Sequence, residues 1–281
     1  MSNKTAFGIG VVLLAVSVAW LGTRYAHRYA PASAESADAE QPSTDRVTVR
    51  FFRNPKPVAD FVIRTIDGHE VSAASLRGKV TIVNFWATWC PPCRAEIPDL
   101  VALQQKYRDR LQVVGISEDE DGPGTTDKVL RFAADHDMNY PIAMTSPELE
   151  EKFPGIGALP TSFLIDREGR VVQRHVGMLR ASLTELETRA LAGLPIDARI
   201  EEVDQTQKLE LGSNAQALTI PGLDLARLSP AQRTAALEKL NTDACTCGCD
   251  LTLARCRVDD PTCGISLPLA RKIVDHIAAQ R

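Results

Sequence analysis

The fold is decided by one stretch, VTIVNFWATWCPPCRAEIP, which occupies residues 80–98. Its first seven residues are β-branched, aromatic or otherwise apolar for the most part, a composition typical of a buried strand. Apolar residues then recur at helical spacing from Ile97 to Tyr107. The pair Cys90 and Cys93 is therefore predicted to lie where a buried strand turns into a helix.

That position changes the chemistry of the first thiol. The unpaired N–H groups and the macrodipole of a helix N-terminus favour an anion, so Cys90 is expected to ionise readily and act as a nucleophile. Cys93, three residues on, can then attack Cys90 and resolve a mixed disulfide. A Cys-x-x-Cys pair also begins many zinc sites, but such a site needs two further ligands nearby. Two prolines between the cysteines, after an apolar strand, favour the redox interpretation.

The motif WATWCPPC at residues 86–93, followed by Glu96 and Pro98, resembles the membrane-anchored TlpA/ResA group of thioredoxin-like proteins. The resemblance covers about residues 55–194. It implies a thioredoxin-like α/β fold, a central mixed sheet flanked by helices, with no cofactor in the redox domain. It also implies reduction of protein disulfides outside the cytoplasmic membrane, in cytochrome c maturation or copper-site assembly.

Two polar residues bear on the mechanism. Glu96 is three residues beyond Cys93, so both lie on one helix face. A half-buried carboxylate there can accept the proton of Cys93, with its own pKa raised by burial, and the resemblance implies this role. The alternative is a first-turn acid that only complements the helix dipole. Asn84 stands where thioredoxin carries an acid beneath the active site, and Asn cannot accept that proton.

A second diagnostic stretch, LPTSFLID, occupies residues 159–166. The resemblance implies that Pro160 is cis and lies against the Cys-x-x-Cys turn, with the Leu159 backbone offered to a substrate strand. Trp89, Pro91 and Pro92 complete the predicted substrate-binding set. The alternative for Pro160 is an ordinary loop proline.

The chain begins with a predicted transmembrane anchor at residues 1–29, followed by a flexible tether at residues 30–54. Residues 6–22 carry no charge and are just long enough to span the hydrocarbon of a bilayer as a helix. The alternative is a cleaved signal peptide, but charged residues separate the apolar run from the nearest small-x-small site. The resemblance places the body of the protein on the periplasmic side of the cytoplasmic membrane, supplied by a membrane electron donor.

The redox domain is predicted to occupy residues 55–195, and Asp67-Gly68 between two apolar runs predicts a hairpin turn near its start. The acidic run at residues 118–121 is interpreted as a solvated loop, and a helix is expected to begin with Thr126 as its N-cap. The net charge of −4 argues against a dedicated nucleic-acid binder.

Residues 196–281 are predicted to form a linker and a small, mainly helical Cys-rich module that the resemblance does not cover. Ser229 begins a helix with a capping-box pattern, and Ser266 is expected to cap a last helix from Leu269. Between them lie five of the chain's seven cysteines: Cys245, Cys247, Cys249, Cys256 and Cys263. They predict either a soft-metal site for Cu(I) or zinc, which His276 could complete, or a disulfide-stapled module with one thiol left over.

These observations favour an enzyme, an anchored thiol–disulfide oxidoreductase. We expect it to act as a reductant of specific protein disulfides. The alternatives are a disulfide oxidant or isomerase, and a metal-binding or metal-delivery protein that uses the C-terminal cysteines. A peroxiredoxin-like peroxidase is disfavoured because Cys90 and Cys93 form a Cys-x-x-Cys pair.

Overall fold

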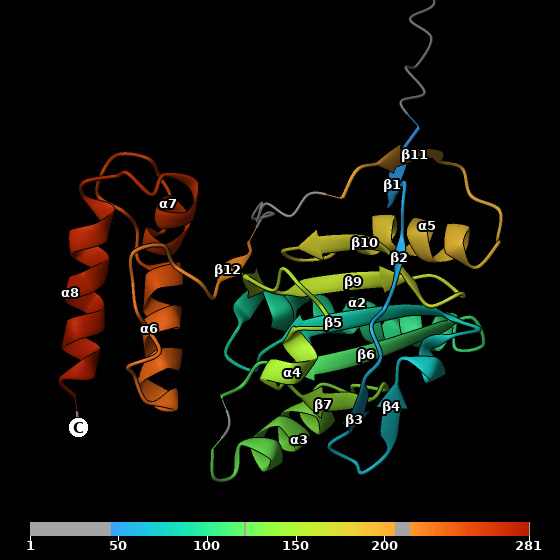
Figure 1. Ribbon diagram of the computed structural model, residues 1–281, viewed down its shortest axis with the longest axis horizontal. Coiled ribbons are helices and arrows are strands. Elements are labelled where there is room, and N and C mark those ends of the chain that lie inside the picture. The colour runs from blue at the N-terminus through green and yellow to red at the C-terminus, as the bar shows by residue number, and fades with distance from the viewer. Residues whose placement is uncertain (1–45, 121, 206–213, 281) are drawn as a thin grey trace, which may run out of the picture. The chain divides into compact units, whose positions relative to one another are not determined.

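The stretch at residues 80–98 folds as its sequence predicts, into a central strand and a helix joined by a short turn (Figure 1). The computed structural model describes residues 46–120, 122–205 and 214–280. Strand β5 spans Val80–Trp86 and is buried at every position, as expected for a strand covered on both faces. Helix α2 spans Pro91–Lys106 and buries Ile97, Leu100 and Leu103.

The central sheet has six strands in the order β2-β10-β9-β5-β6-β7. Strand β5 pairs in parallel with β6 and antiparallel with β9, so the sheet is mixed, as predicted. The remaining strands of this sheet have the following bounds: β2, Lys56–Pro57; β6, Leu111–Ser117; β7, Ile142–Met144; β9, Thr161–Ile165; β10, Arg170–Val176.

Helices cover this sheet, and a predicted hairpin lies beside it. Helix α2 contacts both β6 and α5, which spans Ala181–Leu191. The hairpin pairs β3, Val62–Arg64, with β4, Glu70–Ser72, around the expected Asp67–Gly68 turn. Three short elements complete this region: the 3-10 helix η1, Ala74–Leu76; helix α3, Thr125–Asp135; and helix α4, Pro147–Glu150. The N-cap of α3 is Gly124 and not Thr126, because Thr126 already lies inside the first helical turn.

Two strands fall in stretches that were predicted to be tether and linker. Strand β1, Thr48–Phe52, pairs in parallel with β11, Arg199–Val203, over five residue pairs. Val49 and Phe52 of β1 are buried, so these residues belong to the folded body. The predicted anchor at residues 1–29 lies outside the described residues. Within residues 46–280, apart from the stretches not described, the structure has no helix with the length and apolar character that crossing a bilayer requires.

The C-terminal region is mainly helical, as predicted. Helix α6 spans Pro230–Thr242 and begins with the expected capping box of Ser229 and Gln232. Helix α7 spans Leu253–Asp259, and α8 spans Ser266–Ala278. Helix α8 thus begins before the predicted Leu269, and Ser266 lies within it, after Ile265 as N-cap. The three helices share a second hydrophobic core, separate from that of the sheet.

Candidate active site

The two cysteines of the motif lie at the start of α2. Cys90 is the N-cap residue, and its Sγ accepts a hydrogen bond of 3.3 Å from the backbone N–H of Cys93. Pro91 and Pro92 occupy the first helical positions, where a missing N–H costs nothing. Cys90 and Cys93 form a disulfide with an S–S distance of 2.02 Å, and neither is exposed to solvent.

A buried polar network lies next to this pair. Asn84, on β5, donates hydrogen bonds to Glu96 Oε1 at 2.8 Å and to Ser162 Oγ, on β9, at 2.9 Å. The other carboxylate oxygen of Glu96 accepts from the backbone N–H of Leu179 at 2.7 Å. Burial raises the pKa of Glu96 to about 7, and the hydrogen bonds from Leu179 and Asn84 oppose that rise. Glu96 is therefore a buried carboxyl with the raised pKa that its position predicted, and its role as proton acceptor stays a prediction.

Glu96 also borders a cavity that leads toward the surface. This cavity of about 200 Å³ is lined by Glu96, Leu179 and Thr184 among others, and it extends to Lys106 and Glu185. Lys106 and Glu185 form an ion pair of 2.7 Å, and the Lys106 side chain is half exposed. Glu96 thus borders a space that reaches the Lys106–Glu185 ion pair.

The acidic run after β6 is not the solvated loop that its composition predicted. Asp119 is buried, and its carboxylate accepts a hydrogen bond of 2.8 Å from the backbone N–H of Thr88 and another from the Thr88 hydroxyl. Lys128 of α3 pairs with the same carboxylate at 3.1 Å. Asp119 thus fixes the turn between β5 and Cys90. Burial likewise raises the pKa of neighbouring Glu118, to about 8, helped by repulsion from Glu150.

The Leu159–Pro160 peptide bond is cis, as the resemblance implied. The expectation for Leu159 needs correction, because its backbone is not open to a substrate. Strand β8, Ala158–Leu159, pairs antiparallel with β12, Gln216–Ala217, so a strand of the same chain occupies this edge. Asn241 of α6 holds the other side of β12 through hydrogen bonds of 2.8 and 2.9 Å to the backbone N–H and carbonyl of Ala217.

The remaining predicted substrate-binding residues differ in exposure. Pro91 is exposed, Trp89 is half-buried, and Pro92 is buried. Trp89 and Pro91 line an open pocket of about 420 Å³ together with Gln216 and residues of α6. The Trp89 ring also packs against the core of the C-terminal helices. The surface around the redox pair is therefore shared between the sheet domain and the C-terminal segment.

The C-terminal cysteines are all free thiols. Four of them, Cys245, Cys247, Cys256 and Cys263, bring their Sγ atoms within 4.8 Å of one another. The fifth, Cys249, is exposed; its thiol interacts with that of Cys247 but is not among the four that lie within 4.8 Å of one another. The exposed His276 also lies outside this group. Hydrogen bonds from Ser266 and from the backbone N–H groups of residues 265 and 266 lower the pKa of Cys263 to about 6.

Comparison with known proteins is consistent with this geometry. Residues 55–174 match the model of the AhpC/TSA family. The thiol-disulfide oxidoreductase ResA of Bacillus thuringiensis (strain Al Hakam) is 33% identical over 123 residues, which is 43% of this chain and 69% of that protein. The thioredoxin-like protein YneN of Bacillus subtilis (strain 168) is 32% identical over 120 residues, with the same coverage of 43% and 69%.

Among solved structures, a thiol:disulfide interchange protein of the thioredoxin family from Chlorobium tepidum TLS is 38% identical, with a TM-score of 0.46. The match covers 50% of this chain and 98% of that chain. The family match ends at residue 174, so the cysteine-rich C-terminal helices lie beyond it. The sequence matches show that the chain belongs to the TlpA/ResA-like family of thioredoxin-like proteins and is a thiol–disulfide oxidoreductase.

Proposed function

We propose that the protein is a reductant of specific protein disulfides and that Cys90 and Cys93 are its dithiol. One observation carries this proposal: Cys90 caps a helix N-terminus, with Cys93 in the first turn and a buried carboxyl, Glu96, one turn further on. The helix N-terminus stabilises the Cys90 thiolate, which is the attacking form.

The reaction proceeds in two exchanges. The Cys90 thiolate attacks one sulfur of the substrate disulfide, forms a mixed disulfide and releases the other substrate sulfur as a thiolate. The Cys93 thiol then loses its proton to Glu96 and attacks Cys90 Sγ, which releases the second substrate thiolate and leaves the Cys90–Cys93 disulfide. Two electrons pass to the substrate, whose thiolates take up two protons, and a dithiol donor must later reduce Cys90–Cys93.

The substrate class and location follow from the family resemblance and the N-terminal sequence. We place the redox domain on the periplasmic side of the cytoplasmic membrane, held by the uncharged segment at residues 6–22 and supplied by a membrane electron donor. The expected substrates are disulfides of the cytochrome c maturation or copper-site assembly type. Trp89 and Pro91, which are not buried, are the residues that we expect to contact them first. Contact with Leu159, Pro160 and Pro92 would require the segment that carries β12 to move away from β8.

The reduction potential of the Cys90–Cys93 pair tests the direction of electron flow. The full chain is equilibrated in dithiol buffers of graded potential, alkylated, and digested, and mass spectrometry follows only the peptide that carries both cysteines. A reductant requires a value near or below the −270 mV or so of thioredoxin. A value near about −120 mV would make the protein an oxidant or isomerase instead.

A second function, metal binding, is favoured by the convergence of four sulfur atoms in the C-terminal helices. We propose that this module binds zinc or copper(I) alongside the redox activity rather than in place of it. Metal analysis of the full chain after purification without chelators tests this, and a metal-free protein that takes up neither ion contradicts it.

A further inference from the structure

We propose that Cys245, Cys247, Cys256 and Cys263 form a closed four-thiolate site for one zinc ion, which joins the three C-terminal helices. This inference rests on the metal binding proposed above and specifies its ion, its ligands and its role. It assigns no ligand role to Cys249.

The geometry of the four sulfurs fits a single tetrahedral ion. With Zn–S bonds of about 2.3 Å, the sulfurs of a tetrahedral site lie about 3.8 Å apart. In this structure Cys245 Sγ and Cys247 Sγ are 3.3 Å apart, and Cys247 Sγ and Cys256 Sγ are 3.9 Å apart. All four lie within 4.8 Å of one another, so the site needs only small side-chain movements to close around an ion.

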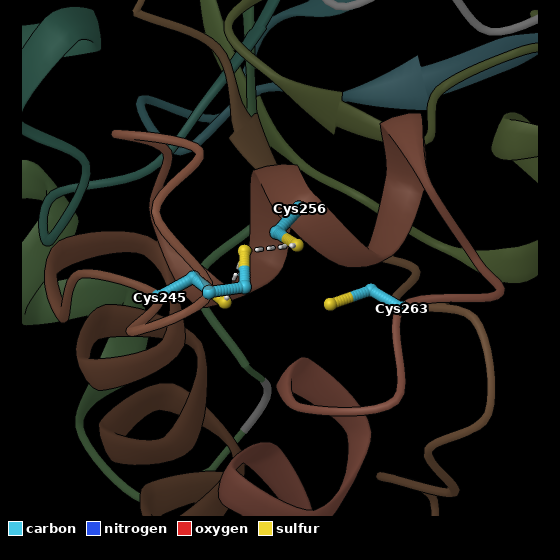
Figure 2. Close-up of side chains that lie close together, drawn as sticks. Cys245, Cys256 and Cys263 are labelled. Carbon is cyan, nitrogen blue, oxygen red and sulfur yellow. Dashed lines mark hydrogen bonds between the residues drawn. The ribbon is translucent and has the colours of Figure 1, made fainter.

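The four ligands come from three separate segments (Figure 2). Cys245 and Cys247 lie in the turn after α6, Cys256 lies within α7, and Cys263 lies in the loop before α8. Figure 2 shows the sulfurs of Cys256 and Cys263 turned toward the space between the drawn side chains, with a dashed line from Cys256 to the neighbouring sulfur. One ion would therefore tie the end of α6, the middle of α7 and the start of α8 together.

The arrangement favours zinc over other thiophilic centres. Tetrahedral sites with four sulfurs hold zinc or iron, whereas an iron–sulfur cluster needs its cysteines spread around several iron atoms, farther apart than these. A site that delivers copper(I) must exchange its ion through accessible thiols. Here Cys245 and Cys256 are buried in the core of the module, and the exposed thiol, Cys249, lies outside the group.

A structural role fits the size of the module. From Gln216 to the end of α8 it has fewer than about 70 residues, a size at which a hydrophobic core is usually supplemented by a metal or disulfides. Its buried core includes Cys245 and Cys256, so an ion at their sulfurs would be anchored within that core. Binding involves no electron transfer: four thiols lose four protons to water as four Zn–S bonds form.

A buried arginine lies beside the segments that carry two of the ligands. Four thiolates and one Zn²⁺ carry a net charge of −2, which is unfavourable in a buried position without a partner. The buried Arg257 follows Cys256 directly, and its guanidinium donates to Ser266 Oγ at 3.4 Å and to the Pro221 carbonyl at 3.0 Å. A positive charge is thus fixed between α7 and the start of α8.

The test uses the full chain with Cys90→Ser and Cys93→Ser, so that the redox pair cannot contribute ligands. Reduced protein is loaded with Zn²⁺ alone, desalted, and its zinc and thiol contents are measured. We expect about one zinc per chain, and the same from Cys249→Ser. Cys245→Ser, Cys247→Ser, Cys256→Ser and Cys263→Ser should each lower the retained zinc at least tenfold.

Two further measurements separate loss of a ligand from loss of folding, and zinc from other metal ions. Cys263→His replaces the half-exposed cysteine with another residue that can bind zinc, so this variant should retain zinc. Cys263→Ser removes the same sulfur without supplying a ligand and should lose zinc. Tetrahedral Co²⁺ bound in place of zinc should give the visible absorption of a thiolate site. Zinc loss in Cys249→Ser, or stronger retention of copper(I) or iron than of zinc, would overturn the four-cysteine zinc assignment while leaving metal binding intact. Failure to retain any of these ions would overturn both proposals.

Discussion

At the scale of single residues, Glu96 is a buried carboxyl of the candidate site whose protonation depends on the fold. Its carboxylate is buried beside Asn84 and the Leu179 N–H, with its pKa raised to about 7. Asn84 links this carboxylate to Ser162 on the neighbouring strand. Because Asn84 cannot itself accept a proton, the role of proton acceptor for Cys93 that we propose belongs to Glu96, which Asn84 positions through its hydrogen bond.

The first prediction concerns Glu96→Gln. The rate at which Cys93 resolves a mixed disulfide at Cys90 should rise with pH through about 7 in the native protein, because Glu96 accepts a proton only when ionised. Glu96→Gln should slow this step at pH 8 by roughly 10²-fold or more and remove the inflection. Stopped-flow kinetics with a model disulfide measure it.

Asp99→Asn serves as the matched variant. Asp99 raises the pKa of Glu96 through charge repulsion, so its neutralisation should move the inflection to lower pH and preserve the rate at high pH. An unchanged pH profile in Glu96→Gln would remove Glu96 from the mechanism.

The second prediction concerns stability. The folded-state pKa of Glu96, about 7, lies above its ordinary value of 4.5, so folding favours the protonated form. The stabilising contribution of protonation is complete below pH 4.5 and is lost as the pH rises through 7. The free energy of unfolding of Glu96→Gln relative to the native protein should therefore increase by about 3 kcal/mol across that window and level off above it. Urea unfolding at graded pH measures this, and a difference independent of pH would contradict it.

At the scale of secondary-structure elements, the site depends on segments that approach it from elsewhere in the chain. The turn before Cys90 is fixed by Asp119, which follows β6, and by Lys128 on α3. The edge at Leu159 is occupied by β12, which Asn241 of α6 holds in place. Neither restraint belongs to the Cys-x-x-Cys motif itself.

The third prediction is that Asp119→Ala destabilises the fold by roughly 3 kcal/mol, because it leaves the buried Thr88 N–H and hydroxyl without their acceptor. Asp135→Ala, at the exposed end of α3, should change the free energy of unfolding by less than about 0.5 kcal/mol. Thermal and urea unfolding followed by circular dichroism give both values. Equal stability of the two variants would show that the Asp119 contacts contribute little.

The fourth prediction is that Asn241→Ala exposes the redox pair. Loss of the two hydrogen bonds to Ala217 should loosen β12 from Leu159, and reduced Cys90 should then react several-fold faster with iodoacetamide. Thr242→Ala, one residue on and at the pocket lined by Trp89 and Pro91, removes no hydrogen bond to β12 and should leave the rate unchanged. If both variants react at the native rate, β12 does not restrict access to Cys90.

At the scale of the whole molecule, sequence-based prediction succeeded where the signals are local. Strand β5, helix α2 and the helix that Ser229 caps follow from periodicity and capping patterns within a few residues. The pairings β1–β11 and β8–β12 join strands that are short and far apart in sequence, and the composition of each strand does not identify its partner. The predicted solvent exposure of Asp119 was wrong for a related reason. An acidic run indicates exposure, and the hydrogen-bond partner that allows Asp119 to be buried, Thr88, is distant in sequence. The five C-terminal cysteines were recognised as a group, but only the fold separates four of them from Cys249.

The parallel pairing of β1 with β11 has a mechanical consequence. Phe52 and Val203 lie at the same end of the pair, and Thr48 and Arg199 lie at the other. A pull on the chain before Thr48, opposed by a pull after Val203, would act along the strands and in opposite directions. The hydrogen bonds between the strands would then be loaded together in shear rather than broken one after another. They include two at the ends of the pair, from the Arg53 N–H to the Val203 carbonyl and from the Arg199 N–H to the Val47 carbonyl. A tensile force applied through the two flanking segments would thus act first on the β1–β11 pair. The central sheet and helix α2, which carries Cys93 and is capped by Cys90, would bear that force only after the pair had separated.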